Sequence, residues 1–357
     1  MMLLVLAVAL GVLTWALRLP ARVTVALVVV LWAAAILAHL ALPDGHVIRG
    51  AIGGDARIWA AAGVVAALVL AYRQGLAALR ARSRPADPPA PPAPAEAPTA
   101  DDRLSDDELD RYARHIVLRE IGGTGQRRLK AARVLVIGAG GLGSPALLYL
   151  AAAGIGRITV IDDDTVSVSN LQRQILFATA DAGRPKAEAA AERLHAINPN
   201  VTVEVRAERL TEANAADLVA GQDLILDGSD NFDTRYLANR AAVAAGVPLV
   251  SAAITQWEGQ IGLYDPARGG ACYQCVFPER PAPGLAPACA EAGVVGPLPG
   301  VLGAMMALEA VKHLTGAGQG LRGHVLIYDG LWGETRRIAT RARPDCPVCG
   351  QPGRVGP

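Results

Sequence analysis

The sequence predicts an α/β domain with a mixed, mostly parallel sheet, carried behind an α-helical membrane anchor. Short β-branched apolar runs alternate with helical patterns through the C-terminal two thirds of the chain, which is typical of a parallel sheet covered by helices. A glycine-rich turn follows the first of those runs. Hydrophobic residues make up 52% of the 357 residues, and three charge-free apolar segments lie within the N-terminal 80 residues.

The N-terminal region contains three apolar segments. Residues 1–17, 23–42 and 58–72 lack charged side chains apart from His39 in the second segment. A helix needs about 20 apolar residues to cross a bilayer, so the second segment is long enough and the other two are short. We expect a membrane anchor of about three transmembrane helices in residues 1–80. The alternative is two spans and one segment lying on the membrane.

Arginines near the span ends predict the orientation of the anchor. Arg18 and Arg22 flank the first turn, and four more follow the third segment, namely Arg73, Arg80, Arg82 and Arg84. Positive residues collect on the cytoplasmic side. The sequence therefore predicts an inner (cytoplasmic) membrane protein whose catalytic domain faces the cytoplasm.

A proline-rich segment separates the anchor from the remainder of the chain. Seven prolines fall between residues 84 and 98, and such sequences form extended, semi-rigid spacers. We therefore expect a linker at residues 81–100 and a single α/β domain at residues 101–357. The formal net charge of +1 gives no electrostatic reason to expect nucleic acid as a partner.

Secondary structure follows from local patterning in the expected domain. Strands are expected at residues 133–137, 157–161, 201–206, 223–226, 249–252, 260–264 and 324–328. Helices are expected at residues 144–153, 185–197, 232–245 and 301–314. Ser144 and Pro145 fit the cap and first position of the first of these helices. The alternation predicts helices on both faces of the sheet.

The glycine turn predicts a nucleotide site. It contains Gly138, Gly140, Gly141 and Gly143, and it joins an expected strand to an expected helix. Glycines let the backbone approach a phosphate, and a helix N-terminus favours negative charge. Asp162 ends the next strand, where an acid commonly binds ribose hydroxyls. This arrangement alone fits NAD, FAD or ATP.

Polar residues after the second strand favour nucleotidyl transfer over hydride transfer. Asn170, Arg173 and Lys186 could stabilise charge on a triphosphate, although either cation alone could equally lie on a solvated helix face. Asp230 follows a later strand and could hold Mg²⁺ against phosphate oxygens. Asp230 or Asn231 could instead cap the following helix.

Four of the five cysteines form two CxxC pairs, which indicates a metal site rather than disulfides in a cytosolic domain. Four thiolates suit tetrahedral Zn²⁺, which would attach the C-terminal tail to the domain. The expected ligands are Cys272, Cys275, Cys346 and Cys349. The fifth, Cys289, follows a proline-rich stretch, and by itself a lone cysteine is most often a small buried hydrophobe.

At similar spacing throughout, residues 104–349 resemble the E1-like adenylyltransferases of the MoeB/ThiF/HesA family. The resemblance rests on residues 111–114, 138–143, 162–164, 169–174, 183–186, 227–231, 258–260, 272–275, 289–293 and 346–349. It implies a Rossmann-like adenylation domain with a C-terminal zinc tail. It also implies ATP-dependent adenylation of the C-terminal glycine carboxylate of a ubiquitin-like sulfur carrier ending in Gly-Gly, of molybdopterin or thiamine type.

The resemblance also implies residue roles. The glycines would cradle phosphates, Asp162 would bind ribose, and Asn170, Arg173 and Lys186 would contact the triphosphate. Asp230 would hold Mg²⁺, and Arg114 would reach the ATP site of a partner subunit in a homodimer. Cys289 matches a loop cysteine that in some members links covalently to the carrier or its sulfur.

Two departures and three alternatives accompany this interpretation. His115 stands where the family usually has glutamine, and no sulfurtransferase domain follows, so we expect a separate sulfur donor. The alternatives are an E1-like tRNA-modifying dehydratase, an NAD-binding membrane oxidoreductase, and a non-catalytic anchor that recruits a ubiquitin-like partner. The cations around the glycine turn argue against the last two.

Overall fold

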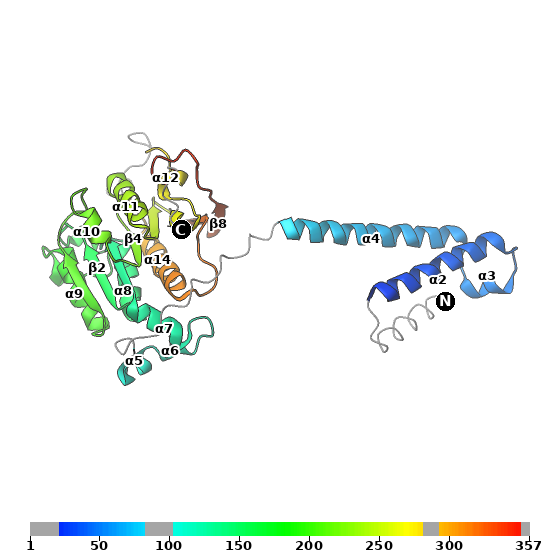
Figure 1. Cartoon of the computed structure of the whole chain (residues 1–357), viewed down its shortest axis with the longest axis horizontal. Helices are drawn as coiled ribbons and strands as arrows, with labels where there is room; N and C mark the ends of the chain where they lie inside the picture. Colours follow the sequence, from blue (N-terminus) through cyan, green and yellow to red (C-terminus); the bar gives the residue numbers. More distant parts are fainter. Residues whose placement is uncertain (1–20, 83–102, 281–292, 351–357) are drawn as a thin grey trace. The chain divides into compact units, whose positions relative to one another are not determined.

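The structure is a computed structural model that describes residues 21–82, 103–280 and 293–350 (Figure 1). The chain divides into two compact units, Met1–Pro89 and Ala90–Pro357. The expected first apolar segment and most of the expected linker lie outside the described residues. The predicted domain boundaries therefore stay a prediction.

The N-terminal unit contains α2 (Ala21–Ala41), α3 (Val47–Ile52) and α4 (Ala56–Arg82). Helices α2 and α4 are joined by a hydrogen bond from Trp32 Nε1 to the Trp59 carbonyl oxygen, 2.9 Å long. A side chain at Gly63 would overlap the Trp32 ring, so glycine permits this approach. Among the described residues, one stretch, Ala56–Ala78, is long and apolar enough to cross a membrane, and the apolar part of α2, Ala26–Ala41, is shorter. The expected lengths of the second and third apolar segments were therefore wrong, because the third helix extends beyond residues 58–72 at both ends.

The C-terminal unit is built on one eight-stranded mixed sheet with the strand order β3-β2-β1-β4-β5-β6-β7-β8. The first five strands in this order pair in parallel and the last three pair antiparallel. The strands are β1 (Arg133–Ile137), β2 (Arg157–Ile161), β3 (Thr202–Arg206), β4 (Leu224–Asp227), β5 (Leu249–Ile254), β6 (Glu258–Tyr264), β7 (His324–Asp329) and β8 (Glu334–Ala339). The predicted mixed, mostly parallel sheet is confirmed.

Helices cover both faces of this sheet, as predicted, and each face has its own apolar core. On one side lie α7 (Gly122–Ala131), α8 (Gly143–Ala153), α9 (Lys186–Ile197) and α14 (Pro297–Thr315). On the other lie α10 (Ala215–Val219), α11 (Phe232–Ala245) and α12 (Tyr273–Val276). The remaining short elements are α5 (Asp106–Arg111), α6 (Ala113–Ile116) and the 3₁₀ turns η2 (Val168–Asn170), η3 (Thr179–Asp181) and η4 (Pro266–Arg268).

Several predicted boundaries are wrong by a few residues. Helix α8 begins at Gly143 with Leu142 at its cap, and the predicted cap Ser144 instead donates its hydroxyl to the Ala139 carbonyl, 3.1 Å away. Helix α14 begins at Pro297 rather than Val301. Strand β8 was not predicted, because its sequence is largely charged and exposed. Such side chains suit the unpaired edge of a sheet, where they discourage pairing with other chains.

Candidate active site

The glycine turn occupies the carboxyl end of β1 and needs glycine at two positions. Gly138 has a φ of 89°, a left-handed conformation that other residues rarely adopt. A side chain on Gly143 would overlap the carbonyl oxygen of Gly138. A side chain on Gly141 would come within 3.1 Å of Pro299 in α14. The turn therefore lies compactly at the carboxyl edge of the sheet, which is where ligands bind in open α/β folds.

Asp162 follows β2 and is tied to the glycine turn. Its Oδ2 accepts a hydrogen bond from the Ala139 N–H at 2.7 Å, and its Oδ1 accepts one from the Asp164 N–H at 2.9 Å. Burial raises the pKa of Asp162 above its usual value, although Lys186 and the two N–H donors lower it. Each oxygen keeps a second lone pair, so the carboxylate can accept hydrogen bonds from ligand hydroxyls.

Lys186, the first residue of α9, lies beside Asp162. Its side chain is 4% exposed, and Nζ donates to Asp164 Oδ2 at 2.7 Å. Helix α9 thus delivers a buried cation to the carboxylates that follow β2. A buried ammonium group held by an exposed carboxylate can change partners when a phosphate enters.

Arg173 and Asn170 form a second polar pair near the glycine turn. Arg173 Nη2 donates to Asn170 Oδ1 at 3.1 Å. The Arg173 stem lies near Gly141, 3.6 Å from the position that a side chain there would occupy. The structure therefore brings the glycine turn together with Asp162, Asn170, Arg173 and Lys186, and their roles towards a nucleotide stay a prediction.

Gln174 belongs to this site, although the sequence interpretation gave it no role. It is 5% exposed, its Oε1 has no hydrogen-bond partner among the described residues, and its Nε2 lies near Gly140. Its place in the run of residues 169–174, beside Asn170 and Arg173, was the only signal that could have identified it.

The loop after β4 carries Asp230 and packs against the glycine turn. A side chain on Gly228 would come within 3.2 Å of both Gly143 N and Leu142 Cβ. Asp230 is exposed, and Asn231 caps α11 by accepting from the Thr234 N–H at 2.9 Å. The cap is therefore Asn231, which leaves the Asp230 carboxylate available for Mg²⁺, a cation that prefers such oxygen ligands. The magnesium role of Asp230 stays a prediction.

Two predicted site residues are not placed in this group. Arg114 is exposed on α6, which is held to α7 by a 3.1 Å hydrogen bond between His115 Nδ1 and Gln126 Oε1. Its expected place in the ATP site of a partner subunit stays a prediction. Cys289 lies outside the described residues, and its covalent role stays a prediction.

The four cysteines of the two CxxC pairs form one cluster at α12 and the C-terminal tail. Sulfur–sulfur distances are 3.7 Å for Cys272–Cys275, 3.6 Å for Cys272–Cys346 and 3.3 Å for Cys275–Cys349. A disulfide requires about 2 Å, whereas tetrahedral zinc with bonds of about 2.3 Å holds sulfurs about 3.8 Å apart. The donor set therefore fits zinc in a closed, structural site.

Electrostatics differ among the thiols of this cluster, because burial raises the pKa values of Cys272 and Cys349. Burial alone would raise the pKa of the Cys346 thiol, but N–H donors from Cys349 and Val348 help lower it to about 7. Zinc binds thiolates, so a readily ionised thiol favours metal binding.

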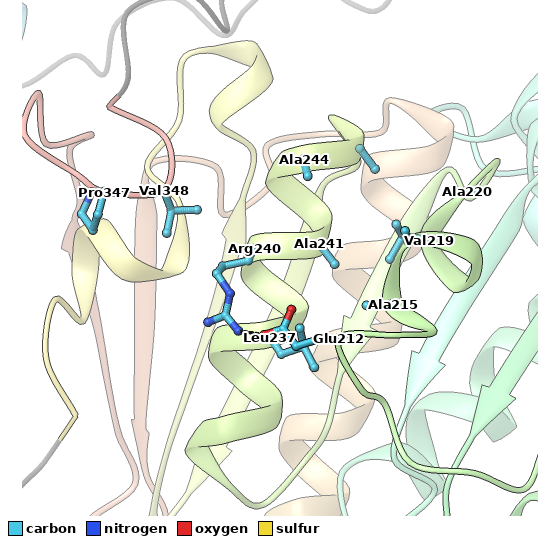
Figure 2. A pocket seen from close by; sticks show the side chains of 12 residues that line it. Glu212, Ala215, Val219, Ala220, Leu237, Arg240, Ala241, Ala244, Pro347 and Val348 are labelled. Carbon is cyan, nitrogen blue, oxygen red and sulfur yellow. Dashed lines mark hydrogen bonds and ion pairs between the residues drawn. The ribbon is translucent and has the colours of Figure 1, made fainter.

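A separate pocket of about 620 Å³ lies between α10 and α11. Figure 2 shows its lining: Arg240 and Glu212 face each other, Ala215 and Val219 lie on one side, and Pro347 and Val348 on the other. It shares no lining residue with the glycine turn, the residue 162–186 segment or the Asp230 loop. It is therefore not the nucleotide site.

Known proteins resemble this chain in sequence and in fold. Residues 112–348 match the model of the ThiF family. The chain is 52% identical over 252 residues to the sulfur carrier protein adenylyltransferase of Thermus thermophilus, covering 70% of this chain and 93% of that protein. It is 49% identical over 246 residues to the SAMP-activating enzyme E1 of Haloferax volcanii, covering 69% and 90%. The fold resembles E. coli MccB crystallised with ATP, with a TM-score of 0.59 at 25% identity, covering 68% and 75%.

Proposed function

This chain belongs to the ThiF family, and on that premise we propose that its C-terminal unit uses ATP to adenylate the C-terminal carboxylate of a small sulfur carrier protein. One observation carries the proposal. The glycine turn, Asp162, Arg173 and Lys186 meet at one edge of the sheet, and the Asp230 loop packs against the turn. That combination suits a triphosphate whose α-phosphate is attacked.

The reaction is an in-line displacement. A carboxylate oxygen of the carrier's terminal glycine bonds to the α-phosphorus of ATP, and the bond from that phosphorus to the bridging oxygen breaks. The products are an acyl-adenylate and pyrophosphate. No general base is needed, because the attacking carboxylate is already ionised at pH 7.

The chain's own residues position the substrates and stabilise charge. Asp162 accepts hydrogen bonds from the ribose hydroxyls, and the glycine-turn backbone approaches the phosphates. Asn170, Arg173 and Lys186 bind the triphosphate and stabilise negative charge on the leaving pyrophosphate. Asp230 would hold Mg²⁺, which when bound neutralises phosphate charge. Arg114 completes the site of a partner subunit, so the active form is a homodimer.

The remaining parts support this activity. Zinc held by the four clustered cysteines fixes the tail, and a separate protein donates sulfur. The Cys289 thiolate attacks the acyl carbon of the carrier adenylate, forms a thioester with the carrier and releases AMP. A Cys289→Ser variant would then keep adenylation but lose a thiol-sensitive adduct with the carrier on non-reducing gels. An adduct that persists in this variant would exclude Cys289.

We also propose that the N-terminal unit holds the enzyme on the cytoplasmic face of the inner membrane. Exposed apolar side chains on α4, among them Val64 and Leu68, support this placement. After alkaline carbonate extraction the full chain should remain in the membrane fraction, and residues 101–357 alone should be soluble. Recovery of the full chain in the soluble fraction would refute the anchor.

ATP–pyrophosphate exchange tests the central proposal. Residues 101–357 would be assayed with and without candidate carriers ending in Gly-Gly. Exchange that appears with one carrier establishes adenylation and identifies the pathway. A zinc-loaded, ATP-binding protein that shows no exchange with any carrier would contradict the proposal.

A further inference from the structure

A buried ion pair lies directly beneath the Asp230 loop. Asp227, the last residue of β4, has no exposed surface, and Arg235 of α11 is 5% exposed. Arg235 Nη1 is 3.7 Å from Asp227 Oδ2. Burying two charges costs more than their attraction returns unless further hydrogen bonds satisfy them. The hydrogen-bond partners of Asp227 and Arg235 therefore indicate the role of this ion pair.

The Asp227 carboxylate binds the loop on one side and β5 on the other. Its Oδ1 accepts from the Ser229 N–H at 3.0 Å and from the Ser229 hydroxyl at 2.5 Å. Its Oδ2 accepts from the Ser251 hydroxyl at 2.7 Å. Three donors thus compensate the charge, and two of them belong to a single residue of the loop.

The Arg235 guanidinium joins the same loop to the same strand from the opposite side. Nη1 donates to the Ala252 carbonyl at 2.6 Å and to Ser251 Oγ at 3.2 Å. Nη2 donates to the Ser229 carbonyl. Asp227 therefore binds the N–H of Ser229 and Arg235 binds its C=O, one residue before Asp230. These two carbonyl contacts come from two different nitrogens of one planar guanidinium, whereas a lysine side chain has a single nitrogen.

Both sets of hydrogen bonds hold the backbone of the loop that carries Asp230. Gly228 packs against Leu142 and Gly143, so this loop lies directly against the glycine turn. We propose that Arg235 and Asp227 are positioning residues that fix the direction of the Asp230 carboxylate towards Mg²⁺-bound nucleotide. This inference rests on the proposed function, and it assigns neither residue a contact with substrate.

The test is Arg235→Lys in the full chain, purified in detergent. Lysine keeps the charge opposite Asp227 but cannot bridge Ser229 and Ala252. Arg240→Lys is the matched control, because Arg240 lies on the same helix and pairs with Glu212 at the surface. Binding of the fluorescent analogue N-methylanthraniloyl-ATP would be titrated with Mg²⁺. Exchange of amide hydrogens in residues 228–231 would be followed by mass spectrometry.

Arg235→Lys should raise the half-saturating Mg²⁺ concentration about tenfold, the effect of losing one good hydrogen bond to a charged group. Binding without Mg²⁺ should stay within about twofold, while amide exchange in residues 228–231 accelerates. Arg240→Lys should match the wild type in each measurement. If Arg235→Lys does not fold, Ser251→Ala should shift the Mg²⁺ dependence in the same direction, because it removes a partner of both charges.

Two results separate the inference from its premise. An unchanged Mg²⁺ dependence in a folded Arg235→Lys or Ser251→Ala variant overturns the positioning role. Wild-type protein whose nucleotide binding ignores Mg²⁺, or that shows no pyrophosphate exchange with any carrier, instead overturns the proposed function.

Discussion

At the scale of single residues, the nucleotide site depends on how Lys186 and Asp162 share their surroundings. Lys186 is buried and lies close enough to lower the pKa of Asp162, whereas burial raises it. Asp164, the ion-pair partner of Lys186, is 67% exposed. Removing the lysine would therefore leave the Asp164 carboxylate solvated, while Asp162 would keep its two N–H donors from Ala139 and Asp164.

Lys186→Ala should lower pyrophosphate exchange by at least about 100-fold, because it removes a cation that stabilises the leaving phosphates. The free energy of unfolding should fall by no more than about 1 kcal/mol, since Asp164 stays hydrated. Exchange kinetics and urea unfolding measure the two effects. Arg193→Ala, on the exposed side of the same helix, is the control. Full exchange activity in Lys186→Ala would disprove the assignment.

Asp162→Asn should show a pH-dependent change in stability. Because the folded pKa of Asp162 is raised above 3.8, the folded state binds more protons than the unfolded state in the window above that value. Wild-type stability from this group therefore falls as pH rises through the window. The unfolding free energy of Asp162→Asn, relative to wild type, should rise from pH 4 towards neutrality in urea titrations. A difference that is flat or falls with pH would contradict the raised pKa.

At the scale of elements, the site depends on close packing between loops and helix ends. The turn after β1 touches the loop after β4, and α14 packs against the first turn of α8 through Gly303, where a side chain would overlap Leu142 and Pro145. Two glycines of the turn differ in the space available for a side chain. Gly143 has no room for a methyl group, whereas Gly140 has a neighbour, Gln174 Nε2, only at an ordinary 3.6 Å.

Gly143→Ala should therefore lower the melting temperature by about 5–10 °C, because the methyl group forces the turn and α8 apart. Gly140→Ala should keep it within about 2 °C and weaken ATP binding alone, since only the approach of the phosphate is obstructed. Calorimetry and nucleotide titration distinguish the two. Equal thermal losses in both variants would refute the packing account.

At the scale of the whole molecule, the four clustered cysteines tie the tail to the sheet. Cys272 and Cys346 are separated by 74 positions in sequence, yet their sulfurs are 3.6 Å apart. Pro347 and Val348, which lie between Cys346 and Cys349, form one wall of the 620 Å³ pocket against α10 and α11 (Figure 2). Loss of a metal from this cluster would therefore release both the C-terminal tail and the pocket wall formed by Pro347 and Val348.

Cys346→Ser should lose most of the zinc and lower the melting temperature by at least about 5 °C, because binding energy at a structural zinc site contributes to folding. Metal analysis and calorimetry give both values. Cys289→Ser should retain one zinc per chain and the wild-type melting temperature. A Cys346→Ser protein with full zinc content would show that the cluster is not the metal site.

Local sequence determined much of this protein, because some structural requirements are local. Turn glycines, strand periodicity and CxxC spacing predicted β1, β2, α11 and the four-cysteine cluster without reference to distant residues. The same holds for Asp162, Asn170, Arg173 and Lys186, each of which follows a recognisable strand or turn. Their grouping at one edge follows from the rule that parallel strands end together.

Only the tertiary structure decided the contacts that depend on distant partners. Strand β8 forms because β7 offers it hydrogen bonds, not because its charged sequence favours a strand. The Asp227–Arg235 pair needs β4, β5 and α11 assembled before its partners exist. The choice of Asn231 as the helix cap, which leaves Asp230 exposed, was undecided in the sequence because either side chain can cap. Helix and strand propensity and motif spacing depend on residues close in sequence. Burial and charge compensation depend on residues that are distant in sequence and become neighbours only in the folded domain.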